Sequence, residues 1–250
     1  DGRVSIVTGG AKGIGRHYSL ALAAHGARVM IADIVDGAEL AAEIAAKHGA
    51  NSVASEVCDV SDEASVKRLV ASTLERFGQI DVLVHSAALY ARLHEQKFTE
   101  IDVDVWDKVM AVNLRGTFLV SKHVALRMIP RKHGKIINIG SLGSELARPT
   151  IAPYTAAKGG IKNLTRSMAV EWAQHGIQAN AIGPGYMLTD MNEALMNDPK
   201  FDSFVKGRTP TRRWGLPEEL VGAAVFLASP ASNYVNGQII YVDGGMLAVL

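Results

Sequence analysis

Cysteine is almost absent from this chain of 250 residues. Cys58 is its single cysteine, so no disulfide can form within the chain, and its cysteine content does not indicate an oxidising compartment. We therefore expect a cytoplasmic protein. The chain opens on Asp1, Gly2 and Arg3, with neither an initiator methionine nor the pattern of a signal peptide, and we expect that some native N-terminal residues precede it.

Long apolar runs and an excess of one charge are also missing. Every apolar stretch is interrupted within about ten residues, whereas a helix that spans a bilayer needs about 20. The 26 Lys and Arg against 25 Asp and Glu leave a formal net charge of +1, too small to attract nucleic acid or an anionic membrane. We expect neither kind of partner.

The composition that remains is typical of a globular protein. Hydrophobic residues make up 48% and charged residues 20%, which excludes a disordered or low-complexity chain. A chain of this length is close to the upper size for one hydrophobic core. We therefore expect residues 1–250 to form a single domain.

Short β-branched runs alternate with longer stretches of helical periodicity, which predicts an α/β fold with a parallel sheet. The apolar character of the runs is that of strands covered by helices on both faces. The predicted strands are 4–8, 29–33, 52–59, 81–86, 135–140, 178–182 and 238–242. The predicted helices are 14–24, 37–47, 62–77, 104–128, 154–174 and 217–227, with Ser61 as a candidate N-cap of the third.

The stretch 184–215 is the least regular part of the sequence and is rich in Met, Asn, Pro and Arg. Long irregular insertions in compact α/β domains are usually lids or binding loops. We expect this segment to be a substrate-binding lid within the domain.

A glycine-rich turn lies directly after the first predicted strand and opens the first helix. Gly9, Gly13 and Gly15 permit a tight turn and a close approach of backbone N–H groups to a pyrophosphate, whose charge the helix N-terminus stabilises. Lys12, within the turn, is a candidate phosphate contact. The turn predicts dinucleotide binding.

Asp33 ends the second predicted strand, where a carboxylate can accept hydrogen bonds from an adenosine ribose and repel a 2′-phosphate. This position favours NAD over NADP. Asp59, at the end of the third strand, is a candidate adenine contact or a helix cap.

Tyr154 and Lys158 are one helical turn apart and share a helix face. A neighbouring ammonium favours the phenolate and brings the pKa of the tyrosine from its reference value near ~10 toward the working pH, so that the phenol can exchange a proton with an alcohol. Ser141 follows a strand at the ligand-binding edge of the sheet and could hold a substrate oxygen. Asn113 is a poor helix-interior residue, which suggests a kink or a bound water.

These motifs, with Pro184-Gly185, resemble the short-chain dehydrogenases/reductases in order and across essentially the whole chain. The resemblance implies a single Rossmann-type doubly wound domain, a homotetramer and a catalytic tetrad of Asn113, Ser141, Tyr154 and Lys158. By analogy Tyr154 is the acid/base, Lys158 lowers its pKa, Ser141 orients the substrate and Asn113 supports a proton-relay water. The implied cofactor-binding residues are Gly9, Lys12, Gly13, Ile14, Gly15, Asp33, Asp59, Val60, Ser86, Ala87, Tyr154, Lys158, Pro184, Gly185 and Thr189.

One motif departs from the family pattern. The family usually has Asn-Asn-Ala-Gly after the fourth strand, and this chain has His85-Ser86-Ala87-Ala88. We expect a local repacking near the adenosine ribose and a structural role for His85. The histidines lack a metal-ligand spacing such as H-E-x-x-H, so we expect no metal.

The second half of the chain is similar to the gluconate 5-dehydrogenase (5-keto-gluconate reductase) subgroup, notably in 144–149, 151–154 and 208–215. A sugar acid needs a cation for its carboxylate and hydrogen-bonding groups for its hydroxyls. The candidate substrate-binding residues are Arg92, Ser141, Glu145, Arg148, Tyr154 and Tyr186. Leu142, Tyr186, Met187 and Leu188 equally suit an apolar or aromatic secondary alcohol, and that alternative stays open. A 3-oxoacyl-carrier-protein reductase and a non-catalytic NAD sensor also stay open.

Overall fold

The computed structural model describes residues 2–89 and 96–249. Seven parallel strands form one sheet in the order β3-β2-β1-β4-β5-β6-β7. Their bounds are β1 (Val4–Thr8), β2 (Arg28–Asp33), β3 (Val53–Val57), β4 (Val82–His85), β5 (Gly134–Ile139), β6 (Ile177–Pro184) and β7 (Ile239–Val242). The predicted single α/β domain with a seven-stranded parallel sheet is confirmed, with strand ends shifted by a residue or two.

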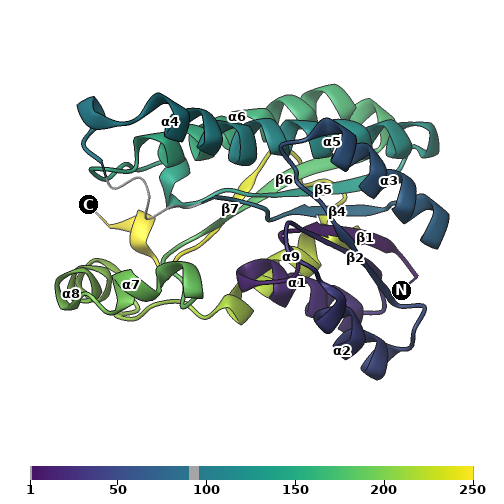
Figure 1. Cartoon of the computed structure of the whole chain (residues 1–250), viewed down its shortest axis with the longest axis horizontal. Helices are drawn as coiled ribbons and strands as arrows, with labels where there is room; N and C mark the ends of the chain where they lie inside the picture. The colour runs from purple at the N-terminus through teal and green to yellow at the C-terminus, as the bar shows by residue number, and fades with distance from the viewer. Residues whose placement is uncertain (1, 90–95, 250) are drawn as a thin grey trace.

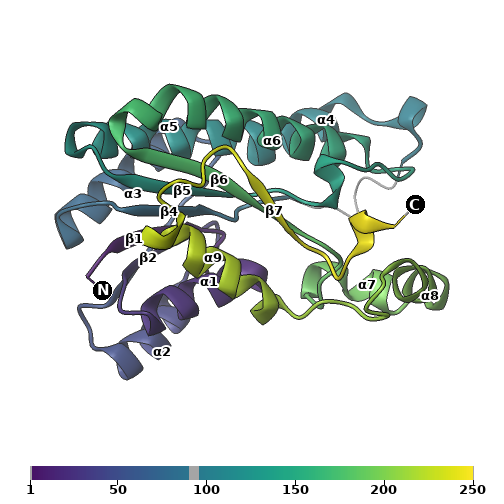
Figure 2. The same ribbon diagram turned by 180° about the vertical axis from the view of Figure 1, so that it is seen from behind.

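Helices cover both faces of the sheet, as Figures 1 and 2 show from opposite sides. One layer holds α3 (Glu63–Phe77), α4 (Val103–Met110), α5 (Gly116–Met128) and α6 (Ala152–Trp172), and the other holds α1 (Gly13–Ala24), α2 (Ala38–His48) and α9 (Val221–Ala228). Alternate strand residues face alternate layers, so Ile6 joins the core that includes Leu119 of α5, whereas Val7 joins the core that includes Leu22 of α1. Burial on both faces accounts for the continuous apolar strands.

The helix predicted over 104–128 is interrupted. After α4 ends at Met110, a π-helical turn runs over Ala111–Arg115, and α5 begins at Gly116. Asn113 lies in that turn and hydrogen-bonds outside the helix, to the backbone of Leu89. The break that Asn113 suggested is therefore present as a π-turn, a feature frequent at functional sites.

The predicted N-cap of α3 is wrong by one residue. Asp62 is the N-cap, and its carboxylate accepts hydrogen bonds from the N–H groups of Ala64 (3.1 Å) and Ser65 (3.0 Å). Ser61 instead donates its hydroxyl to Asp59 at 2.7 Å. A carboxylate has two acceptor oxygens and can bond both orphan N–H groups, which one hydroxyl cannot do as well.

The segment 184–215 is not irregular throughout, which corrects the prediction. It contains α7 (Glu193–Met196) and α8 (Pro199–Arg208), which lie beyond the main body of the sheet in Figure 1. The ring of Tyr186 packs edge-on against Phe201 (5.4 Å between centroids) and Trp214 (5.7 Å). Because these aromatics are scattered in sequence, their common cluster is not visible as a periodic pattern.

Candidate active site

The glycine-rich turn joins β1 to α1, and its glycines are required by close contacts. A Cβ on Gly9, which has a φ of +62°, would lie 2.8 Å from the Cα of Ala87, and a Cβ on Gly15 would lie 2.0 Å from the carbonyl oxygen of Gly9. Gly13 has a φ of +51°, and no heavy atom of its surroundings lies within 4 Å of its Cβ position. The turn is therefore tightly packed toward the sheet and open at Gly13, where the N-terminus of α1 attracts negative charge.

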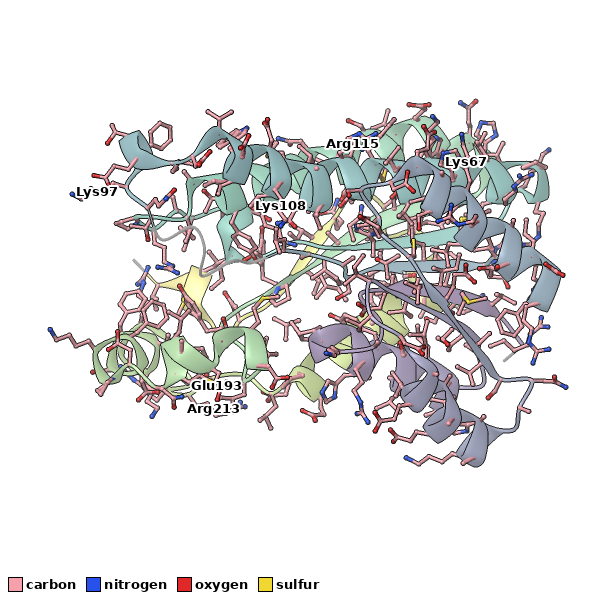
Figure 3. All side chains as sticks on the ribbon, viewed as in Figure 1. Lys67, Lys97, Lys108, Arg115, Glu193 and Arg213 are labelled. Carbon is pink, nitrogen blue, oxygen red and sulfur yellow. The ribbon has the colours of Figure 1, made fainter. Side chains whose placement is uncertain are left out.

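A cavity of about 650 Å³ lies where the parallel strands end. Lys108 lines this cavity; in Figure 3 it lies on α4, in the layer opposite α7 and α8, beside which Glu193 and Arg213 are labelled. Nearly all described residues predicted to bind cofactor or substrate line it: Gly9, Lys12, Gly13, Ile14, Gly15, Asp33, Asp59, Val60, Ser86, Ala87, Ser141, Arg148, Tyr154, Lys158, Pro184, Gly185, Tyr186 and Thr189. Strand ends thus bring residues far apart in sequence to one place.

Tyr154, Lys158 and Ser141 meet at this cavity. Both α6 residues point the same way, and the Nζ of Lys158 lies 5.6 Å from the centre of the Tyr154 ring. Ser141 accepts a hydrogen bond at its Oγ from the N–H of Gly143 (3.1 Å). A Cβ on Gly143 would lie 3.4 Å from the Cε1 of Tyr154, so this loop packs directly against the phenol.

Lys158 is buried, with 3% of its surface exposed, and its Nζ donates to the carbonyl oxygen of Ile139 at 2.6 Å. Burial lowers the pKa of this ammonium to about 8 because the charged form loses water. Lys158 is also held at its backbone. Ser144, in the loop after β5, donates a hydrogen bond from its hydroxyl to the carbonyl oxygen of Lys158 at 2.9 Å. The position of the lysine is thus fixed from both sides.

Asn113 does not line the cavity but fixes a residue that does. Its Oδ1 accepts from the N–H of Leu89 at 2.6 Å, and its Nδ2 donates to the carbonyl oxygen of the same residue at 2.9 Å. Leu89 lines the cavity. The asparagine therefore holds the segment after β4 against the α4–α5 junction.

His85 is fully enclosed beneath the site. Its Nδ1 lies 2.9 Å from the Oγ1 of Thr8, which in turn accepts from the N–H of Ala87 at 3.3 Å. Burial first, and then the charge of Lys158, lower the pKa of the imidazole to about 3. This neutral ring braces β1 against β4, as the structural role expected of it requires.

Asp33 also lines the cavity, but its carboxylate is bonded to the protein backbone. One oxygen accepts from the N–H of Ala11 (3.0 Å) and the other from the N–H of Val35 (3.3 Å). These bonds tie the end of β2 to the glycine-rich turn. Each N–H donor offsets part of the negative charge that a 2′-phosphate would meet, while each carboxylate oxygen keeps a further acceptor site.

The predicted substrate-binding residues divide into three groups. Ser141, Arg148, Tyr154 and Tyr186 line the cavity. The guanidinium of Arg148 lies 5.3 Å from the ring centre of Phe201 on α8. Glu145 does not line the cavity, which corrects its prediction, because its carboxylate bonds Lys162 and Tyr241 instead. Arg92 lies outside the described residues.

Several cavity residues were missed by the sequence reasoning, among them Lys108, Val112, Phe204 and Met246. Lys108 and Val112 are four residues apart on α4 and the turn after it, a spacing that places them on one face. This spacing could identify the two residues as cavity residues only after the structure had shown that their helix face borders the cavity. Phe204 and Met246 have no local signal, because they reach the cavity through the packing of α8 and the C-terminal turn.

No group of three or more His, Cys, Asp or Glu suited to a metal ion occurs within residues 2–89 and 96–249. Over the same ranges, no helix combines the length and apolar character that crossing a membrane demands.

Solved structures resembling this one contain NADP. A gluconate 5-dehydrogenase from Burkholderia cenocepacia J2315, in complex with NADP and tartrate, has a TM-score of 0.93 and 44% identity and covers 100% of this chain and 97% of its own. Two further similar structures contain NADP, one at low occupancy. The predicted preference for NAD is therefore wrong. It rested on the charge of Asp33, whose carboxylate also accepts hydrogen bonds from the N–H groups of Ala11 and Val35 that offset part of that charge.

Proteins of similar sequence are dehydrogenases and reductases, which agrees with the residues found in the cavity. Gluconate 5-dehydrogenase of Gluconobacter oxydans (strain 621H) is 44% identical over 253 residues, covering 100% of this chain and 96% of that protein. 5-keto-D-gluconate 5-reductase of Escherichia coli (strain K12) is 45% identical over 250 residues, covering 100% and 97%. Residues 9–247 match a family model described as enoyl-(acyl carrier protein) reductase. The chain belongs to the short-chain dehydrogenase/reductase family and is an oxidoreductase acting on a CH–OH group.

Proposed function

We propose that this protein interconverts a secondary alcohol and a ketone on a sugar acid, with gluconate and 5-ketogluconate as the reference pair and NADP as cofactor. Full-length identity of 44–45% to enzymes named for that reaction supports the substrate class. The observation that carries the chemistry is the contact of Tyr154 with Lys158 in the same cavity that the glycine-rich turn lines.

The turn fits a dinucleotide. Gly13 is open to the cavity, and the N-terminus of α1 favours a pyrophosphate there. Lys12, which lines the cavity as Asp33 does, would hold the 2′-phosphate. Thr189, Pro184 and Gly185 would bind the opposite end of the cofactor. When bound, the nicotinamide accepts or supplies the hydride.

The tetrad residues would divide the proton chemistry among them. Tyr154 would take the proton of the substrate hydroxyl in oxidation and return it in reduction. Lys158 would stabilise the phenolate through its charge, and Ser141 would donate a hydrogen bond to the substrate oxygen. Asn113, by fixing Leu89, would shape the wall of the site and support a proton-relay water.

Arg148 would bind the carboxylate of the substrate, and Tyr186 a hydroxyl group. Both line the cavity, and both contact the ring of Phe201 on α8. The segment 184–215 would act as a lid, since Tyr186, Thr189 and Phe204 all reach the cavity from it. Closure of such a lid excludes water from the reacting atoms.

The test is an assay of the purified protein with NADP⁺ and a panel of gluconate, neutral polyols and apolar secondary alcohols. The expected result is NADPH formation with gluconate at a higher kcat/KM than with any compound lacking a carboxylate. Failure with every sugar acid would overturn the substrate class. The apolar alcohols are included because Leu142, Leu146 and Met191 also line the cavity, which is the observation favouring that second candidate.

We further propose a cytoplasmic homotetramer. Its support is the pattern of exposed apolar side chains on neighbouring helices, with Phe118 and Leu126 on α5 and Val170 on α6. Exposed apolar groups gathered on one face are typical of a subunit interface. The free, buried Cys58 fits a reducing compartment.

A further inference from the structure

Glu145 joins three separate elements although it does not reach the cavity. It lies in the loop between β5 and α6, and its Oε1 accepts a hydrogen bond from the hydroxyl of Tyr241 on β7 at 2.6 Å. The same carboxylate forms an ion pair with Lys162 of α6. These contacts anchor the loop to a helix and to the last strand of the sheet.

The position of Tyr241 is itself fixed by the neighbouring strand. A Cβ on Gly183 of β6 would lie 2.3 Å from the Cδ1 and 2.4 Å from the Cε1 of this ring, so the ring lies directly on the glycine. Burial, followed by the adjoining Glu145, raises the pKa of the Tyr241 phenol. The hydroxyl therefore stays protonated and donates throughout the neutral range.

The anchored loop carries the residues that would meet the substrate. Ser141, Leu142 and Gly143 before Glu145, and Arg148 after it, all line the cavity. Arg148 comes only three residues after Glu145, and its guanidinium also contacts the ring of Phe201 on α8. A shift of the anchor would therefore move the cation relative to both the cavity and the lid.

Charge also matters at this position. A carboxylate close to an anionic substrate would repel it, but Lys162 neutralises Glu145 and, with the Tyr241 hydroxyl, lowers the pKa of that carboxyl. The cluster thus supplies a fixed anchor without adding net negative charge beside the site.

We propose that Glu145, Tyr241 and Lys162 form a positioning cluster that sets the reach of Arg148 and so determines the preference of the enzyme for substrates that carry a carboxylate. This inference rests on the proposed function. It replaces the direct substrate contact predicted for Glu145 with an indirect role. None of its three members lines the cavity, so the cluster should not affect cofactor binding.

Tyr241→Phe tests the proposal because it removes one hydroxyl and keeps the ring on Gly183. The KM for gluconate should rise about tenfold, the cost of losing a hydrogen bond to a charged group. The kcat, the Kd for NADPH measured by fluorescence, and the KM for a neutral polyol should stay as in the unaltered protein. Tyr234→Phe is the matched control, since Tyr234 is fully exposed, and it should change none of these.

Glu145→Gln and Glu145→Leu extend the test. Glutamine keeps an acceptor for the Tyr241 hydroxyl, so its KM for gluconate should lie between those of the unaltered protein and Glu145→Leu. Equal rises in KM for gluconate and the polyol, a loss of kcat alone, or a lower melting temperature with unchanged kinetics would overturn the positioning role. If the unaltered protein oxidises gluconate and Tyr241→Phe has the same KM for gluconate, only this inference fails. If the unaltered protein oxidises no sugar acid, the proposed function fails as well.

Discussion

Tyr154 is the side chain from which we expect the largest single effect. Tyr154→Phe keeps the ring against Gly143 but removes the group that exchanges the proton, so turnover should fall by at least about 100-fold, the scale of general acid–base catalysis. NADPH binding, followed by quenching of protein fluorescence, should be retained. Residual turnover above about a tenth of the original rate would contradict the assignment.

Lys12 decides the choice of cofactor in our proposal. Lys12→Met should weaken NADP⁺ binding about tenfold or more and leave NAD⁺ binding nearly unchanged, because only the former has a phosphate for the ammonium. Binding constants from isothermal titration check this. Lys67→Met is a suitable control, because Lys67 lies on α3, outside the cavity lining (Figure 3). Equal losses for both cofactors would assign Lys12 to the pyrophosphate instead.

The start of α3 offers a test of one helix. Asp62→Ala should lower the free energy of unfolding by about 1 kcal/mol, since it leaves the N–H groups of Ala64 and Ser65 without their cap. Ser61→Ala leaves both of these bonds in place and should cost clearly less. Urea denaturation of the two variants measures the difference, and a larger loss for Ser61→Ala would restore the original N-cap prediction.

The unfolding free energy of the whole molecule should depend on pH through His85. Its folded-state pKa is about 3 and its ordinary value is 6.5, so between these values the unfolded chain binds a proton that the folded protein excludes. The contribution of His85 to the free energy of unfolding is therefore fully present above pH 6.5 and is lost as the pH drops toward 3. The slope from this one group is up to about 1.4 kcal/mol per pH unit.

His85→Asn isolates that contribution. Urea denaturation at pH 7, 6 and 5 should give a smaller decline for this variant than for the unaltered protein, whereas His48→Asn, at the exposed end of α2, should not change the decline. Parallel declines in all three proteins would show that His85 is accessible to protons in the folded state.

Assembly is the other property of the molecule as a whole. Phe118→Lys together with Leu126→Lys places two charges on the exposed face of α5. If the proposed tetramer forms through this face, the two charges should reduce it to smaller species, because charges in an apolar interface are not solvated. Light scattering coupled to gel filtration gives the mass. An unchanged mass would place the interface elsewhere.

Local patterns in the sequence were enough to predict every strand and the glycine-rich turn. These features are set by residues close together in the sequence. They include the apolar runs of the strands, the helical periodicity of α1 to α3, and the pairing of Tyr154 with Lys158 one helical turn apart. Ser141 was predicted from its place at the end of a strand, and resemblance to a family supplied Pro184-Gly185; all three line the same cavity.

Contacts between distant segments decided the rest. The orientation of the Glu145 side chain is set by Lys162 and by Tyr241, which is almost a hundred residues away in the sequence. The carboxylate of Asp33, at the end of β2, is held by Ala11 in the turn after β1. The sequence alone determined which groups could carry charge and chemistry. Only the tertiary structure decided which of them face the cavity, because the orientation of a polar side chain is set by the partners that packing brings within hydrogen-bonding distance.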